Sequence, residues 1–236
     1  TIGRPAADIH LIDIDTGART KVKDAIDDQT LQASPGGRYL LYLQADQYWT
    51  IDTATRAVVN ISRTAATSFI NRESDATVKQ KPPFGVAGWT KHDEAVILYD
   101  KFDAWRVAAN GSAAARLTNG STEQLRHRYA RLDPDEEWID ASQPIHFSLF
   151  GLWSKRSGYA RLDPGAGAVT PLVVDGKSIT GLAKAKDGGV YAYTVQAFDD
   201  PPDVMVGGPG LQDARAGAGS RPRAGAYPWR KPDVMG

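Results

Sequence analysis

Residues 33–44 read ASPGGRYLLYLQ, and residues 48–61 read YWTIDTATRAVVNI. In the first stretch a Ser-Pro-Gly-Gly turn leads into a run of tyrosine and leucine. In the second, two β-branched or aromatic runs flank a polar turn. Neither stretch has apolar residues at the i, i+3, i+4, i+7 spacing of an amphipathic helix. They therefore predict short antiparallel strands joined by tight turns.

The same order of strand and turn recurs along most of the chain. Related segments read IHLIDIDTGARTKV (9–22), WTKHDEAVILYD (89–100), AWRVAANGSAAARLT (104–118), RLDPDEEWIDASQPIHFSLF (131–150), SGYARLDPGAGAVTPLV (157–173), AKAKDGGVYAYTVQ (183–196) and DVMVGGPGL (203–211). Corresponding turns near residues 15, 53, 110, 164 and 208 are 38, 57, 54 and 44 residues apart. A four-stranded propeller blade takes roughly 40–50 residues.

The repeat predicts an all-β fold, a β-propeller of four to five blades, either a small closed ring or a segment of a larger propeller. The segment that opens at Asp203 reads as a half-unit without a partner, which favours the segment interpretation. Regular repetition of one strand-turn unit argues against a β-sandwich.

The composition excludes several classes of function. The chain has 236 residues, with 28 Lys and Arg against 28 Asp and Glu, so its formal charge is zero. This balance argues against a general nucleic-acid or anionic-membrane binder. Absence of cysteine removes disulfides, thiolate metal sites and cysteine nucleophiles. With no apolar run of membrane-spanning length, no signal-peptide pattern at its start and no phosphate-cradling loop, the sequence predicts a soluble protein without a cofactor.

The chain divides by composition at residue 213. Residues 1–213 carry the strand pattern and are predicted to form the propeller. Residues 214–236 are rich in Ala, Gly, Pro and Arg, have no apolar periodicity and are predicted to be a disordered basic tail.

Five segments resemble a known family. They read ESDATVKQKPPFGVAGWT (73–90), DKFDAWRVAANGSAAARLTNG (100–120), RHRYARLDPDEEWID (126–140), LWSKRSGYARL (152–162) and LAKAKDGGVYAYTVQAFDDPPD (182–203). They resemble the N-terminal propeller of bacterial serine peptidases of the prolyl oligopeptidase family. The resemblance implies a neighbouring α/β-hydrolase domain as partner, a role in gating peptide access to its active site, and a periplasmic or secreted location.

The family's catalytic machinery has no counterpart in this sequence. A nucleophile elbow requires Gly-x-Ser-x-Gly at a strand-to-helix turn, and none of the serines has glycines at that spacing. The favoured prediction is therefore a propeller portion without its own triad. The alternative is a stand-alone propeller hydrolase that acts on glycosides or esters through carboxylates at the propeller channel.

The densest polar cluster lies at residues 126–137. Its candidate catalytic residues are His127 as a general base, the adjacent pair Glu136 and Glu137 as acid and base, and Asp133. Its candidate substrate-binding residues are Arg126, Arg128 and Tyr129, because arginine binds carboxylate or phosphate in a bidentate manner. The alternative to a catalytic role is that Asp133 initiates a turn and the charged side chains around it cover a solvated loop.

A second cluster, Asp199, Asp200 and Asp203, is a candidate for substrate binding at the propeller channel, with Asp100 and Asp103 in a comparable place. Turn initiation explains these aspartates equally well. The remaining histidines, His10, His92 and His146, are isolated, so the sequence predicts no metal site. The recurring tryptophans are predicted to form inter-blade core: Trp49, Trp89, Trp105, Trp138 and Trp153.

An incomplete propeller would leave a blade face and strand edges uncovered. The ring could close by pairing residues 9–14 with residues 204–206. The sequence instead favours self-association into a homo-oligomer through the exposed blade. A peptide or small molecule at the propeller channel is the other expected partner.

Overall fold

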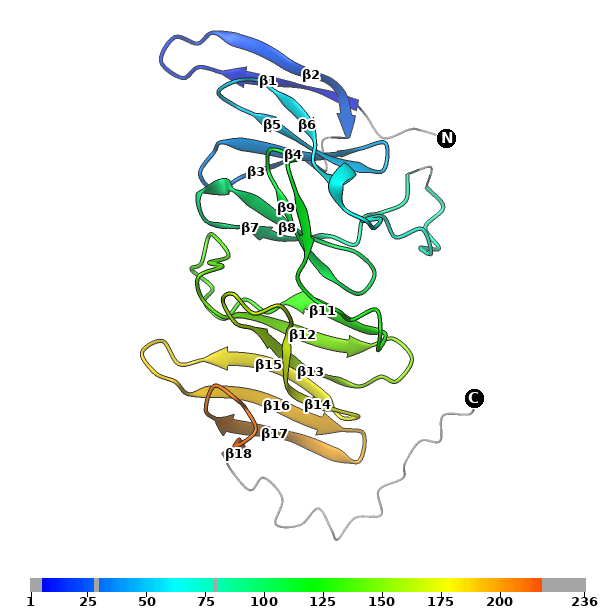
Figure 1. Ribbon diagram of the computed structural model, residues 1–236, viewed down its shortest axis with the longest axis vertical. Helices are drawn as coiled ribbons and strands as arrows, with labels where there is room; N and C mark the ends of the chain where they lie inside the picture. The colour runs from blue at the N-terminus through cyan, green and yellow to red at the C-terminus, as the bar shows by residue number, and fades with distance from the viewer. Residues whose placement is uncertain (1–5, 28–29, 79, 218–236) are drawn as a thin grey trace. The chain divides into compact units, whose positions relative to one another are not determined.

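The computed structural model describes residues 6–27, 30–78 and 80–217, and these form β-sheet almost throughout (Figure 1). Four antiparallel sheets of four strands follow a two-stranded sheet. Within each four-stranded sheet the strands lie side by side in chain order, as in a propeller blade. The predicted all-β propeller is confirmed.

The strand bounds define four blades. The first sheet is the hairpin β1 (Ala6–Ile12) and β2 (Arg19–Asp27). Blade 1 comprises β3 (Gln32–Ala33), β4 (Tyr39–Gln44), β5 (Gln47–Asp52) and β6 (Val58–Asn60). Blade 2 comprises β7 (Val86–Trp89), β8 (Ala95–Tyr99), β9 (Ala104–Ala108) and β10 (Ala114–Arg116). Blade 3 comprises β11 (Leu125–Tyr129), β12 (Ile145–Gly151), β13 (Ser157–Leu162) and β14 (Thr170–Asp175). Blade 4 comprises β15 (Ser178–Lys184), β16 (Tyr191–Ala197), β17 (Asp200–Gly207) and β18 (Arg215–Ala216).

Helical structure is confined, among the described residues, to short 3₁₀ turns. Two of these are η2 (Ser62–Thr64) and η3 (Lys91–Asp93). No helix in the described part of the chain has the length and apolar character needed to cross a bilayer.

The interpretation of the segment at Asp203 as a half-unit without a partner is wrong. Its residues form β17 and the turn to β18, which are the two outer strands of blade 4. The sequence repeat is out of phase with the blades by half a blade, because the turn that it marks joins the third and fourth strands of each sheet. The unmatched half-unit is instead the hairpin β1–β2.

Residues 204–206, through which the ring could close on residues 9–14, are strand residues. They lie in β17, whose two edges pair with β16 and β18, while β1 pairs with β2. The predicted tail boundary at residue 213 is followed at once by β18, and residues 218–236 of the predicted tail lie outside the described residues.

The chain forms two compact units. Unit 1 comprises the residues up to Thr118 together with Glu137–Ala141, and unit 2 comprises Asn119–Glu136 together with the residues from Ser142 onward. Unit 1 therefore contains β1–β2 with blades 1 and 2, and unit 2 contains blades 3 and 4.

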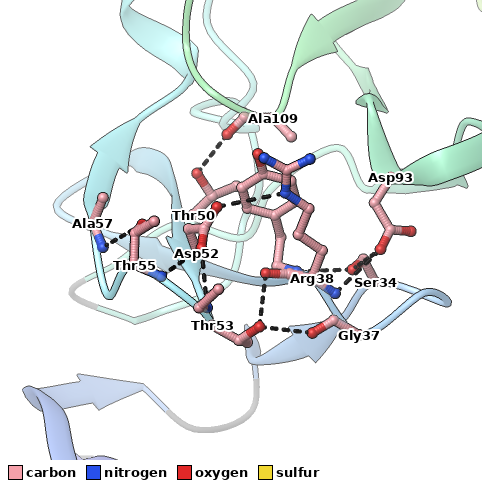
Figure 2. A network of polar contacts seen from close by, with 12 residues as sticks. Ser34, Gly37, Arg38, Thr50, Asp52, Thr53, Thr55, Ala57, Asp93 and Ala109 are labelled. Atoms are coloured by element: carbon pink, nitrogen blue, oxygen red, sulfur yellow. Dashed lines mark hydrogen bonds and ion pairs between the residues drawn. The ribbon is translucent and has the colours of Figure 1, made fainter.

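A buried carboxylate joins the two blades of unit 1 (Figure 2). Asp93, in the β7–β8 turn of blade 2, accepts a hydrogen bond from Ser34 Oγ at 2.6 Å and from the backbone N–H groups of Gly36 and Arg38 at 3.1 and 3.2 Å. These three donors belong to the Ser-Pro-Gly-Gly turn of blade 1. Thr50 Oγ1 adds a second link by donating to Ala109 O at 2.7 Å.

The cores of the two units consist of side chains that alternate along the strands. The core between blades 1 and 2 includes Leu41, Tyr48, Val96, Leu98 and Val107. The core of blade 4 against blade 3 includes Tyr159, Leu172, Ile179, Tyr191 and Tyr193. Each blade thus buries an apolar face against its neighbour within the unit.

Candidate functional site

A concave site lies in unit 2, at one end of blades 3 and 4. An open pocket of about 720 Å³ is lined there by residues of both blades. The pairs Phe150↔Ser157 and Ser178↔Gln196 lie next to the strand ends, so the β12–β13 turn, the β14–β15 link and the β16–β17 turn converge on this end. Loops at one end of a rigid sheet scaffold are where binding residues concentrate.

Strand register determines which side chains of blade 3 reach the pocket. Arg126 pairs with Phe150, and Phe150 pairs with Ser157 on the other side, so the three side chains lie on the same face of the sheet. The Arg126 guanidinium carbon lies 5.6 Å from the Phe150 ring centre, and Lys155 Nζ lies 6.0 Å from it. Two cations therefore flank one aromatic ring at the pocket.

Hydrogen bonds across the two blades hold the pocket walls together. Ser157 Oγ donates to Lys177 O at 2.9 Å and accepts the Ile179 N–H at 2.7 Å. Tyr159 Oη accepts the Leu182 N–H at 3.0 Å. Burial raises the pKa of Tyr159 above its ordinary value, although the Leu182 N–H opposes this, so the hydroxyl stays protonated.

The pocket is lined by three cations and no acidic side chain. Lys177 Nζ is paired with Asp200 at 2.7 Å, and Lys155 Nζ donates to Leu152 O at 2.7 Å. Within the described part of the chain, Arg126 has no carboxylate partner, and its side chain contacts the Phe150 ring. Its guanidinium is the cation most available to a ligand.

The other candidates of the cluster at residues 126–137 have structural contacts. His127 is buried, with Nδ1 2.9 Å from Leu125 O and its ring edge-on to Phe147. Arg128 Nη1 donates to the backbone oxygen of His127 at 2.7 Å. His127 is therefore an interior side chain of blade 3 and does not line the pocket, whereas a general base has to reach a ligand.

The two adjacent glutamates are not brought to a common site. Tyr129 Oη donates a hydrogen bond to Glu136 Oε2, whereas Glu137 is exposed, and the boundary between the two compact units falls between them. Asp133 is exposed and accepts the Asp135 N–H at 2.9 Å, as the turn interpretation predicts. Glu136 therefore has a structural partner, whereas Glu137 lies at the surface.

The aspartates of the second cluster lie at the β16–β17 turn and along β17. Asp200 neutralises Lys177 beside the pocket, and Asp203 pairs with Val195 in the sheet ladder. Asp199 lies in the turn itself, outside the pocket lining.

Asp100 and Asp103 lie at the equivalent β8–β9 turn of blade 2, as their comparable place in the sequence predicts. Asp100 Oδ2 accepts hydrogen bonds from Thr67 Oγ1 at 2.9 Å and Trp105 Nε1 at 2.7 Å. Asp103 is buried and accepts from Thr118 Oγ1 at 2.7 Å. Both carboxylates organise the turn.

The remaining histidines are placed apart from one another. His92 is exposed in η3, His10 lies on β1, and His146 is buried on β12 beside the Tyr191 ring. Burial, together with the charges of Arg161 and Lys184, lowers the pKa of His146 to about 4. No group of three or more His, Asp or Glu within the described ranges is arranged to hold a metal ion.

The tryptophan prediction holds at some positions and fails at one. Trp89 and Trp105 are buried in the core between blades 1 and 2, and Trp49 packs on the core under β1–β2. Trp153 is 83% exposed, because it lies in the β12–β13 turn beyond the end of the sheet. It is therefore not inter-blade core.

Of the residues that the sequence singled out, Arg126 lines the pocket and Asp200 lies beside it, paired with Lys177. Phe150, Lys155, Lys177 and Phe198 come from three different turns, and no motif joins them. The sequence offers one signal for these pocket residues. Each of them lies close to the end of a predicted strand, at the end of the sheet where the pocket is found.

Comparisons with known proteins support the fold. No protein-family model matches the chain, and no curated protein matches its sequence. A structure of oligogalacturonate lyase in complex with manganese aligns over 90% of this chain and 59% of its own, with 13% identity and a TM-score of 0.51. An oligogalacturonate lyase structure from Vibrio parahaemolyticus aligns over 89% of this chain and 59% of its own, with 9% identity and a TM-score of 0.52. The chain thus spans about three fifths of these β-propeller proteins, and at such identities the likeness concerns the fold alone.

Proposed function

We propose that this chain is the substrate-recognising propeller portion of a larger peptidase of the prolyl oligopeptidase type. In this role the propeller holds or admits a peptide, and the chemistry takes place on a neighbouring α/β-hydrolase domain. The proposal combines the observed propeller fold with the sequence resemblance of residues 73–203.

The observation that carries the recognition role is the pocket between blades 3 and 4. Its volume of about 720 Å³ falls within the range of roughly 300–1,000 Å³ typical of small-molecule sites. Inter-blade hydrogen bonds of Ser157 and Tyr159 preorganise its walls, and preorganisation lowers the cost of binding. Aromatic and cationic side chains line it, which suits a short peptide segment.

The hydrolase alternative gains no support of its own from the described residues. Glu136 is engaged by Tyr129, Glu137 lies in the other compact unit, and His127 is buried beside Phe147. The proposal therefore rests on recognition by the pocket.

The native reading frame tests the peptidase link. An α/β-hydrolase coding region with a Gly-x-Ser-x-Gly elbow directly downstream supports it. A downstream region that encodes no such domain contradicts it.

The kinetics of that native enzyme test the recognition role. Gln196→Ala, which removes a polar side chain from the pocket lining, is expected to raise KM for peptide substrates. Turnover of a small chromogenic ester, which does not need the pocket, should stay the same. Equal effects on both substrates, or an effect on neither, would count against recognition by this pocket.

A further inference from the structure

We propose that the pocket between blades 3 and 4 binds an organic carboxylate, with the Arg126 guanidinium holding the carboxylate and an apolar or aromatic group of the ligand lying against Ile179 and Phe198. This inference rests on the recognition role proposed for the same pocket and does not depend on the peptidase link. It assigns the chemical class of the ligand and the residue that selects it.

The charge of the lining selects an anion. Arg126, Lys155 and Lys177 face the pocket, while its lining contains no Asp or Glu. Asp200 pairs with Lys177 from beside the pocket, so that pair carries no net charge. The remaining two cations give the pocket a positive potential that attracts an anion and disfavours a cationic ligand.

The geometry of Arg126 selects a planar anion. A guanidinium presents parallel N–H donors that match the two oxygens of a carboxylate. The contact with the Phe150 ring, whose centre lies 5.6 Å from the guanidinium carbon, holds Arg126 at the pocket wall. Lys155, which also contacts the Phe150 ring, can serve as a second, less directional charge.

The apolar side chains of the pocket favour a ligand whose carboxylate is attached to an aromatic or branched aliphatic group. Phe198 is 73% exposed at the β16–β17 turn, Ile179 is buried on β15, and both side chains line the pocket. An exposed aromatic side chain that lines a pocket gains most from covering by another apolar group. A ligand with an aromatic or branched aliphatic group next to its carboxylate would contact both parts at once.

Four small probes test the ligand class on the 236-residue chain. They are N-acetyl-L-phenylalanine, its primary amide, N-acetylglycine and phenyl phosphate, and each dissociation constant is measured by titration calorimetry or ligand-observed NMR at low salt. We expect the phenylalanine acid to bind about tenfold or more tightly than its amide, since only the acid can form the paired hydrogen bonds with Arg126. N-acetylglycine should bind more weakly than the phenylalanine acid. Added salt should weaken binding of the acid.

Two arginine variants separate a specific contact from general charge. Arg126→Gln should remove the preference for the acid over the amide and leave binding of the amide unchanged. Arg156→Gln is the matched control, because Arg156 is an exposed arginine in the β12–β13 turn that does not line the pocket. It should leave the affinity for the acid within about twofold of the wild-type value, since an exposed charge that does not line the pocket contributes little.

Asp200→Asn provides a test that does not require a change at Arg126. The variant releases Lys177 beside the pocket and should raise the affinity for the phenylalanine acid severalfold, with no gain for the amide. The three variants, Arg126→Gln, Arg156→Gln and Asp200→Asn, are each checked for a far-UV circular dichroism spectrum like that of the wild-type protein.

The outcomes distinguish this inference from the proposed function. Equal binding of acid and amide overturns the carboxylate assignment and leaves recognition by the pocket intact. Tighter binding of phenyl phosphate than of the acid also overturns it, in favour of a phosphate ligand. If none of the four probes binds, the carboxylate inference fails, while the peptide kinetics of the native enzyme still decide the recognition role.

Discussion

At the scale of single residues, buried ionisable groups have the clearest physical roles. Asp93 is 2% exposed and its charge is balanced by hydrogen-bond donors rather than by a cation. Burial raises the pKa of Asp93, but hydrogen bonds from Ser34 Oγ and from the Gly36 and Arg38 N–H groups outweigh burial and hold the pKa below its ordinary value. The carboxylate form is therefore the one that joins blades 1 and 2.

Asp93→Asn should lower the free energy of unfolding by about 2–3 kcal/mol, because charge-assisted hydrogen bonds are lost and the amide N–H₂ faces other donors. Asp15→Asn, at an exposed turn position, is the control and should have little effect. Since the folded pKa of Asp93 is lowered, its stabilisation is present above the ordinary value near 3.8 and is lost as pH falls further. Urea unfolding at several pH values measures both effects, and an unchanged midpoint for Asp93→Asn would contradict the assigned role.

His146 should make unit 2 less stable in mild acid. Its pKa is lowered from 6.5 to about 4, so between these values the unfolded chain binds a proton that the folded protein does not. The unfolding free energy is expected to fall as pH drops through this window, by about 3 kcal/mol in total from this group.

Removing the titrating group should remove this pH dependence. In His146→Leu the decline of unfolding free energy between pH 6.5 and pH 4 should be smaller than in the wild type. The exposed His92 serves as the comparison through His92→Asn, which should keep the wild-type profile. Identical profiles for His146→Leu and the wild type would show that His146 is not buried in its neutral form.

At the scale of elements, glycines allow outer strands to approach their neighbours. A Cβ at Gly158 on β13 would lie 1.9 Å from Val173 O on β14, and no side chain can relieve a clash with backbone. β14 in turn leads through Gly176 and Lys177, which line the pocket, into β15. The close approach of β13 and β14 therefore fixes the strand from which this part of the lining continues.

Gly158→Ala should lower the free energy of unfolding by about 2–4 kcal/mol and increase amide hydrogen exchange along β14, because the outer strand must shift. Gly167→Ala is the matched control, since a Cβ there meets nothing within 4 Å. Hydrogen exchange followed by mass spectrometry measures the change. Protection of β14 at the wild-type level in Gly158→Ala would contradict the close approach.

At the scale of the whole molecule, the described surface includes an uncovered sheet face. Val204 and Val206 alternate along β17 with side chains that pack on the core, and they are 52% and 38% exposed. Adjacent exposed valines on a sheet face favour contact with another apolar surface. Self-association through a second copy of this chain remains our prediction.

Light scattering at micromolar concentration should give a mass above the 25.5 kDa of a single chain. The double variant Val204→Thr and Val206→Thr should shift the mass towards 25.5 kDa, because it keeps the β-branched shape and removes the apolar surface. A strictly monomeric wild-type protein would contradict the prediction, and so would an unchanged oligomer in the double variant.

The sequence alone determined the fold class, the strands and the turns between them. Local alternation and turn residues are properties of neighbouring positions, so 39–43 and 48–52 could be assigned to strands that the structure bounds as Tyr39–Gln44 and Gln47–Asp52. The regular spacing of the turns predicted a propeller for the same reason. The repeat does not reveal where a blade begins, because the order of strands within a repeat reads the same whichever strand is counted first. For this reason the segment at Asp203 reads as an unpaired half-unit, although it forms the outer strands of blade 4.

Only the tertiary structure decided the site. Arg126, Phe150 and Lys177 are far apart in sequence, and register and inter-blade packing bring them to one pocket. Conversely, Glu136 and Glu137 are neighbours in sequence, yet Glu136 belongs to unit 2 and contacts Tyr129, whereas Glu137 belongs to unit 1. Adjacency in sequence does not place two side chains at a common site, because the contacts of each side chain depend on the tertiary structure around it.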